Sequence, residues 1–221
     1  MEQHEKGFFA RQPGMGTSHV EWSPNVIIAD AAYIDRVAFN LIVNFERMLM
    51  RRIPPADLAR WIDCVALDGG LRPMENTSSE AGSGEQVTQV VLIHPKGQEK
   101  LENFQPAHFA DELTGKAFRD HLGEFVITSL AVESMVDEDA LFLDVLGTVC
   151  QQKEVRRVMV IPDAEKDGMY AHVRETLRHL DDDSKRVTVF AMQPMTGGNF
   201  RQEILGYSLM NALGIQAEEI K

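Results

Sequence analysis

The stretch Asn25-Val26-Ile27-Ile28-Ala29-Asp30 decides the fold of this 221-residue chain, together with the run from Ala31 to Arg52 that follows it. Four apolar residues in a row after Pro24 predict a short, fully buried strand. In the run that follows, apolar residues recur at helical spacing, which predicts an amphipathic helix. A buried strand that leads directly into such a helix is the first half of a βαβ unit. Asp30 stands at the junction, at the edge where open parallel sheets bind ligands.

Beyond this unit, apolar runs and turn residues predict further strands and helices in alternation. We expect strands over 64–67, 87–93, 125–132, 155–161 and 187–192, and helices over 56–62, 108–122, 137–152, 169–180 and 200–213. This alternation predicts an α/β fold with a mostly parallel central sheet and helices on both faces, a Rossmann-like three-layer sandwich. We expect one domain over residues 25–221, preceded by a polar arm at 1–24 and interrupted by a Ser/Gly-rich excursion at about 72–86.

Composition excludes several classes of protein. The net charge of −12 argues against a broad basic surface that grips duplex DNA. No apolar run approaches the ~20 residues that span a bilayer, so no membrane association is expected. The N-terminal residues lack the apolar segment of a secretory signal, and Cys64 and Cys150 lie in apolar segments, as free thiols do. These features favour a cytoplasmic protein. Neither a dinucleotide-binding nor a P-loop signature is present, and the histidine spacings match no zinc motif.

Carboxylates occur where predicted strands end or helices begin. Asp30 follows the first strand, Asp163 follows the run 158–162, and Asp137 and Asp144 belong to the helix at 137–152. Because the ends of parallel strands meet at one edge of a sheet, these four groups are candidate ligands for one Mg²⁺ or Mn²⁺. A cation held there would polarise a phosphoryl oxygen and activate water. The alternative is structural, since an aspartate directly after a strand routinely caps the next helix.

The order of elements over residues 25–195 resembles the PIN-like nucleases, specifically their NYN branch. The stretch 27–33 corresponds to that family's first strand, which ends in an Asp-Gly-x-Asn type motif. Val136-Asp137 together with Asp144 corresponds to the pair of aspartates that opens a helix in that family. The stretch 161–169 corresponds to its Ser-Gly-Asp-x-Asp-Phe motif. The resemblance implies a metal-dependent ribonuclease that acts on single-stranded RNA, with Asp30, Asp144 and Asp163 as catalytic carboxylates. The chain departs from the pattern: the Asn of the first motif is absent, and Ile161-Pro162 replaces Ser-Gly. A non-catalytic α/β scaffold, acting by self-association or partner binding, is therefore the second hypothesis.

The predicted helix at 31–52 carries two apolar faces. Its main stripe, about 140° wide as in a core-facing helix, consists of Ile34, Val37, Ala38, Leu41, Ile42, Phe45, Met48 and Leu49. A second ridge is formed by Phe39, Val43 and Met50. Large apolar groups on a second face require a cover. A second copy of the chain, as in a homodimer, would supply it, and so would the arm through Phe8, Phe9 or Trp22.

A polar strip separates these two faces and contains three arginines, Arg36, Arg47 and Arg51. They form either a solvated helix face or a contact for single-stranded RNA.

Overall fold

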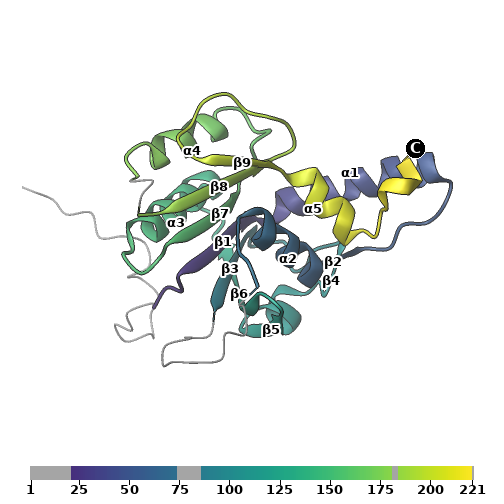
Figure 1. Ribbon diagram of the computed structural model, residues 1–221, viewed down its shortest axis with the longest axis horizontal. Coiled ribbons are helices and arrows are strands. Elements are labelled where there is room, and N and C mark those ends of the chain that lie inside the picture. The colour runs from purple at the N-terminus through teal and green to yellow at the C-terminus, as the bar shows by residue number, and fades with distance from the viewer. Residues whose placement is uncertain (1–20, 74–85, 181–183, 221) are drawn as a thin grey trace, which may run out of the picture.

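The computed structural model describes residues 21–73, 86–180 and 184–220, and a seven-stranded sheet forms its centre (Figure 1). The strands of this sheet are β1 (Asn25–Asp30), β3 (Val87–Pro95), β5 (Lys116–Asp120), β6 (Gly123–Val132), β7 (Arg157–Ile161), β8 (Arg186–Ala191) and β9 (Arg201–Ile204). The α-helices are α1 (Ala31–Leu49), α2 (Leu58–Asp68), α3 (Glu138–Gln151), α4 (Met169–Leu177) and α5 (Leu205–Ala212). The expected arm up to residue 20 and the excursion at 74–85 lie outside the described residues.

The strand order is β5-β6-β3-β1-β7-β8-β9, and only β5 runs antiparallel to its neighbour within this sheet. β1 lies between β3 and β7 and is parallel to both, with Val26 opposite Val158 and Ala29 opposite Ile161. The two apolar runs that end near Asp30 and Asp163 are thus adjacent central strands of the parallel sheet. The chain moves outward from β1 in one direction through β3 and β6, and then in the other through β7, β8 and β9. The gap between β1 and β7 is therefore the topological switch point, where open α/β sheets bind ligands.

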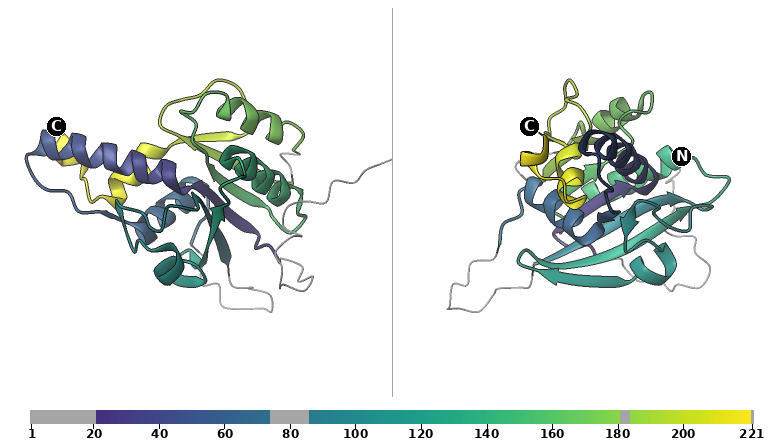
Figure 2. Two further views of the ribbon diagram at one scale, coloured as in Figure 1. Left: turned by 180° about the vertical axis from the view of Figure 1, so that it is seen from behind. Right: turned by 90° about the vertical axis from the view of Figure 1, so that its right-hand side faces the viewer.

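Helices cover both faces of the sheet, as expected for this fold class (Figure 2). One core packs α1, α2 and α5 against side chains such as Ile27 and Met159, and the other packs α3 and α4 against Ile28 and Val160. Successive residues of β1 thus point to opposite faces, and both faces are buried. This double burial explains why the strand has a continuous apolar sequence rather than an alternating one.

Four predicted elements differ from the structure. The expected helix at 56–62 and strand at 64–67 are a two-residue strand, β2 (Ala56–Asp57), followed by the single helix α2. The reason is a helical spacing that continues through the second segment and places Leu58, Trp61, Ile62, Val65 and Ala66 on one buried face. β2 pairs with β4 (Phe104–Gln105) in a separate two-stranded sheet.

The helix expected at 108–122 is a five-residue π-helix, Phe109–Leu113, followed by the edge strand β5. β5 turns back on β6 through a tight hairpin. The helix expected at 200–213 begins as strand β9 and becomes α5 only at Leu205. In both places the sheet edge supplies hydrogen-bonding partners that a single sequence does not reveal.

Helix α1 extends beyond the sheet. All of its buried residues lie between Ala31 and Ala38, and none from Phe39 onward is buried. Its outer half reaches past the body of the molecule to the C-terminal segment (Figures 1 and 2). There Arg51 forms an ion pair with Glu219 of the short 3₁₀-helix Ala217–Ile220. Met48, expected in the core stripe, is 53% exposed because the helix has left the sheet at that point.

Candidate functional site

The carboxylates Asp30, Glu138 and Asp163 lie close to the switch point. Asp30 is the last residue of β1, Asp163 follows β7 by two residues, and Glu138 is the first residue of α3. Each of the three is within electrostatic range of another, since Glu138 and Asp163 both raise the pKa of Asp30 and Asp163 raises that of Glu138. Of the predicted ligands, the structure therefore brings Asp30 and Asp163 together. We call this set the carboxylate cluster.

Asp30 caps helix α1. Its Oδ1 accepts a hydrogen bond of 2.8 Å from the backbone N–H of Tyr33, and the residue is 7% exposed. Burial is the largest cause that raises the pKa of Asp30 to about 6, and the negative charges of Glu138 and Asp163 add to it. The Tyr33 N–H and the Arg36 guanidinium act in the opposite direction. Asp30 thus has the helix-capping role that was the structural alternative, and its carboxylate is at the same time unusually basic.

Asp163 does not cap a helix, since Gly168 occupies the N-cap of α4. Its Oδ2 accepts a hydrogen bond of 2.8 Å from Nη2 of Arg36, whereas its Oδ1 is buried and has no hydrogen-bond partner. The guanidinium of Arg36 also lies 3.9 Å from Glu165 and 5.2 Å from the centre of the Tyr33 ring. One oxygen of Asp163 is thus neutralised within the chain and the other is left without a partner.

Two more buried atoms around the cluster lack hydrogen bonds: Oε1 of Glu138 and the hydroxyl of Tyr33. Buried polar atoms in proteins almost always have a partner, and each exception requires an explanation. Burial raises the pKa of both Glu138 and Tyr33, as it does for Asp30. Three unsatisfied oxygen atoms beside a buried carboxylate are the arrangement expected where a cation or a donor ligand binds.

The other predicted ligands lie outside the cluster. Asp137 caps α3 by accepting a hydrogen bond of 3.0 Å from the backbone N–H of Asp139, which is the structural alternative. Asp144 is exposed, seven residues further along α3, which corresponds to about 10 Å of helix. Glu138 is not among the ligands predicted from the sequence, because it neither ends a strand nor stands at the helix cap. The capping role of Asp137 is the signal that places Glu138 as the first residue inside the helix.

The predicted arginine strip is largely engaged within the chain. Arg36 binds Asp163, and Arg51 binds both oxygens of Glu219 at 2.9 and 3.0 Å. Arg47 is exposed. Two of the three proposed RNA contacts therefore already hold a carboxylate.

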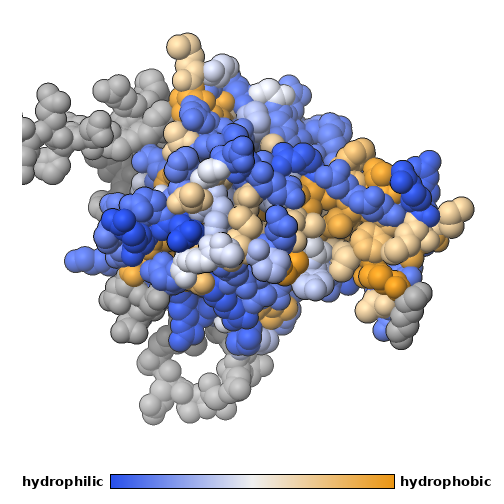
Figure 3. Space-filling model, turned by 90° about the horizontal axis from the view of Figure 1, so that it is seen from above, coloured by the Kyte–Doolittle hydropathy of each residue, from blue (hydrophilic) through white to orange (hydrophobic). Residues whose placement is uncertain are grey.

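The predicted apolar ridge is exposed. Phe39, Val43 and Met50 are 53%, 38% and 88% exposed. Figure 3 shows apolar residues gathered at the end of the molecule where α1 and the C-terminal segment extend outward. Phe8 and Phe9 lie outside the described residues, and Trp22 packs against the core on the α3 and α4 side. Trp22 is therefore not the cover of this ridge.

A second acidic group joins Asp63 of α2 with Asp120 and His121 of the β5–β6 hairpin. Among the residues that the structure describes, this is the one group whose three ligand atoms all lie within 4.8 Å of one another. Burial and a hydrogen bond to Asp120 raise the pKa of Asp63 to about 6. Nδ1 of His121 lies 3.9 Å from Asp63 and 4.0 Å from Asp120, and this ring acts to lower the pKa of Asp63. The oxygen atoms of the carboxylate cluster at the switch point are less closely grouped than the ligand atoms of this second group, and they would have to approach one another to bind a cation.

Two surface hollows lie elsewhere. One, of about 440 Å³, is bordered by α4 and residues 198–199, and the other, of about 490 Å³, by Pro54, Pro106 and the end of α5. Neither is lined by Asp30, Glu138 or Asp163. The unsatisfied atoms and the raised pKa values, rather than the volume of a hollow, mark the switch point as the candidate site.

Of the comparisons with known proteins, the one with protein-family models gives a match, and it spans nearly the whole chain. No curated protein and no solved structure matches the chain. Within the described residues, no helix is both long enough and apolar enough to cross a membrane. One family model does match, and it covers residues 19–220. The chain therefore belongs to DUF6621, a family of unknown function.

Proposed function

We propose that the carboxylate cluster binds Mg²⁺ or Mn²⁺ and that the protein hydrolyses phosphodiesters, with single-stranded RNA as the substrate class. The observation that carries this proposal is the buried Oδ1 of Asp163, which has no hydrogen-bond partner beside two further carboxylates. Oxygen donors of this kind suit magnesium and manganese. The ribonuclease part rests on the resemblance to PIN-like nucleases.

Asp30, Glu138 and Asp163 would hold the cation, and Asp144 has no part in this assignment. A divalent cation so bound polarises a phosphoryl oxygen and lowers the pKa of water. Asp30 with a pKa of about 6 is protonated in a substantial fraction near that pH. Cation binding near or below this pH would therefore release a proton, and binding would become tighter as the pH rises through 6 and level off above it.

Arg36 would orient the phosphate group. Its guanidinium is about half exposed, at 49% for the side chain, and bridges Asp163 and Glu165. A guanidinium held in this way by a cation ligand can offer its remaining N–H groups to a phosphate oxygen. Arg36 thus both restrains Asp163 and presents positive charge at the mouth of the cluster.

The test compares Asp163→Asn with Asp144→Asn as a matched control on an exposed part of α3. Manganese should raise the melting temperature of the unaltered protein and of Asp144→Asn, because a ligand that binds the folded state stabilises it. Asp163→Asn should lose that rise, together with manganese-dependent cleavage of a single-stranded RNA. If manganese has no effect on the unaltered protein, the cation site does not exist. A rise without cleavage would restrict the function to cation binding.

We propose a second function, self-association through the ridge of Phe39, Val43 and Met50. Its support is the exposure of this ridge on a helix that extends beyond the body of the protein. The neighbouring cations Arg51 and Arg52 are ion-paired with Glu219 and Glu46, so the positive charge of these two residues is already offset within the chain. A second copy fits such a surface because a twofold axis would match the ridge with itself.

A further inference from the structure

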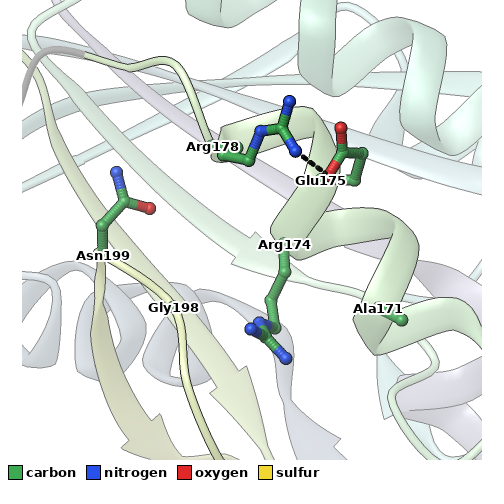
Figure 4. A pocket seen from close by; sticks show the side chains of 6 residues that line it. All are labelled: Ala171, Arg174, Glu175, Arg178, Gly198 and Asn199. Atoms are coloured by element: carbon green, nitrogen blue, oxygen red, sulfur yellow. Dashed lines mark ion pairs between the residues drawn. The ribbon is translucent and has the colours of Figure 1, made fainter.

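We propose that the hollow between α4 and the crossover segment from β8 to β9 binds the phosphate group of a small molecule. Figure 4 shows this hollow, with Arg174 and Arg178 extending from α4 and Gly198 and Asn199 on the crossover segment opposite. It measures about 440 Å³ and contains no member of the carboxylate cluster. The proposal is therefore independent of the proposed function.

Arg174 supplies the first support. Its guanidinium lies so close to Gly197 that a Cβ at position 197 would stand 2.8 Å from Nη2. Gly197 has a φ of +77°, which an L side chain rarely adopts. Within the described residues Arg174 forms no ion pair, although the chain carries a net charge of −12. The backbone thus makes room for a guanidinium whose N–H groups remain available.

The crossover segment is held in place by side chains that surround Gly197. The hydroxyl of Tyr170 donates to the Gly197 carbonyl at 2.8 Å, and Nε2 of Gln202 donates to the same carbonyl at 3.2 Å and to the Tyr170 oxygen at 3.0 Å. Oε1 of Gln202 in turn accepts from the backbone N–H of Met195. A wall fixed in this way loses little freedom when a ligand binds, which favours affinity.

The charged side chains that line the hollow indicate which class of ligand fits it. Arg178 lies one helical turn from Arg174 and is paired with Glu175 at 3.3 Å, where both side chains are more than 60% exposed. Guanidinium groups bind phosphate through paired N–H donors, and the amide of Asn199 adds a neutral donor. The volume exceeds that of a free phosphate and falls in the range of small-molecule sites. Glu175 keeps one negative charge at the rim, so a single phosphate group fits better than a polyphosphate.

The experiment is calorimetric titration of the full chain with phenyl phosphate and with inorganic phosphate, in EDTA and at an ionic strength matched with NaCl. Binding of phenyl phosphate is expected, and Arg174→Gln should weaken it about ten- to a hundredfold, as expected for the loss of a charged hydrogen-bonding group. The affinity of Arg174→Lys for phenyl phosphate should lie between that of Arg174→Gln and that of the unaltered protein, because lysine keeps the positive charge but lacks the planar guanidinium. Arg156→Gln, an exposed arginine away from the hollow, is the matched control and should bind normally.

Two results would overturn the proposal. One is the absence of phosphate binding by the unaltered protein, and the other is equal affinity in Arg174→Gln and the unaltered protein. Asp163→Asn separates this site from the carboxylate cluster, because it should keep full affinity for phenyl phosphate. Loss of binding in Asp163→Asn with retention in Arg174→Gln would place the phosphate at the switch point instead.

Discussion

Nη2 of Arg36 lies 2.8 Å from Oδ2 of Asp163 and joins two residues that are 127 positions apart in the sequence. Arg36 belongs to α1, which follows β1, and Asp163 to the segment that follows β7. The ion pair therefore ties the two halves of the doubly wound sheet together at the switch point. It also leaves Asp163 with one satisfied and one unsatisfied oxygen, which is the feature that the proposed cation site uses.

Arg36→Gln should destabilise the protein in EDTA. The substitution leaves the nearly buried carboxylate of Asp163 without its charged partner, at a cost of about 1–3 kcal/mol in the free energy of unfolding. Urea titration measures this loss. Manganese should stabilise Arg36→Gln more than the unaltered protein, because the negative charge of Asp163 would no longer be offset by the guanidinium on Oδ2 when the cation binds at Oδ1. An equal manganese effect in both proteins would contradict a role for Asp163 as ligand.

Asp30→Asn should stabilise the metal-free protein at pH 7.5 and have little effect near pH 4. The pKa of Asp30 rises from 3.8 to about 6 on folding, so the folded state holds the proton more tightly. Its contribution is fully present below pH 4 and is lost between pH 4 and 6, and amounts to about 2–3 kcal/mol. Asparagine stays neutral and can still accept from the Tyr33 N–H.

The difference between the two stability curves over pH 4–8, measured in EDTA, tests this prediction. Asp57→Asn serves as control, since Asp57 caps α2 in the same way but is exposed. We expect no gain for that variant at pH 7.5. A flat difference between Asp30→Asn and the unaltered protein would show that Asp30 is not the buried acid described above.

Phe39→Asp should convert a dimer into a monomer in light scattering at micromolar concentration. A charge placed in an apolar contact loses the burial of the aromatic ring and leaves an ion without a partner. Asn40→Asp adds the same charge to an exposed neighbour and should leave the dimer intact. Deletion of residues 1–22 should also leave it intact. An unaltered protein that is monomeric at this concentration would refute self-association through α1.

Ile28→Ala should destabilise the fold by about 2–5 kcal/mol, the range for a large-to-small change in a close-packed core. Ile28 is fully buried in β1, where it packs into the core on the α3 and α4 side. Met135→Ala is the control, because Met135 is 98% exposed and should tolerate the change. Equal losses for the two variants in denaturant unfolding would contradict the central position of β1.

The central sheet could be predicted because β1 and β7 carry their own signal, four apolar residues in a row that end at an aspartate. Edge elements carry no such signal. β5 and β9 become strands because β6 and β8 offer hydrogen bonds to them, and α2 was divided because four apolar residues at 64–67 suit a strand or a buried helix equally.

The candidate site could be predicted in part for a similar reason. Asp30 and Asp163 were found because each stands at or just after the end of a recognisable strand, and both lie at the switch point. To predict Glu138 as part of the site, one would have to know that Asp137 caps the helix. To predict the role of Arg36, one would have to know of a contact with a residue 127 positions away. Asp144 was selected by motif position, which does not record how far a helix has turned or advanced from the sheet edge.

The position of β1 between β3 and β7 has a consequence for synthesis on the ribosome. Val26 meets its partner Val158 only after another 132 residues have been added. At the usual 5–20 residues per second, one edge of this apolar strand waits roughly 7–26 s for its neighbour. During that interval the nascent chain presents an unpaired hydrophobic strand, a substrate for chaperones and a template for aggregation. Slowing translation between residues 100 and 157 should therefore lower the soluble yield of this protein.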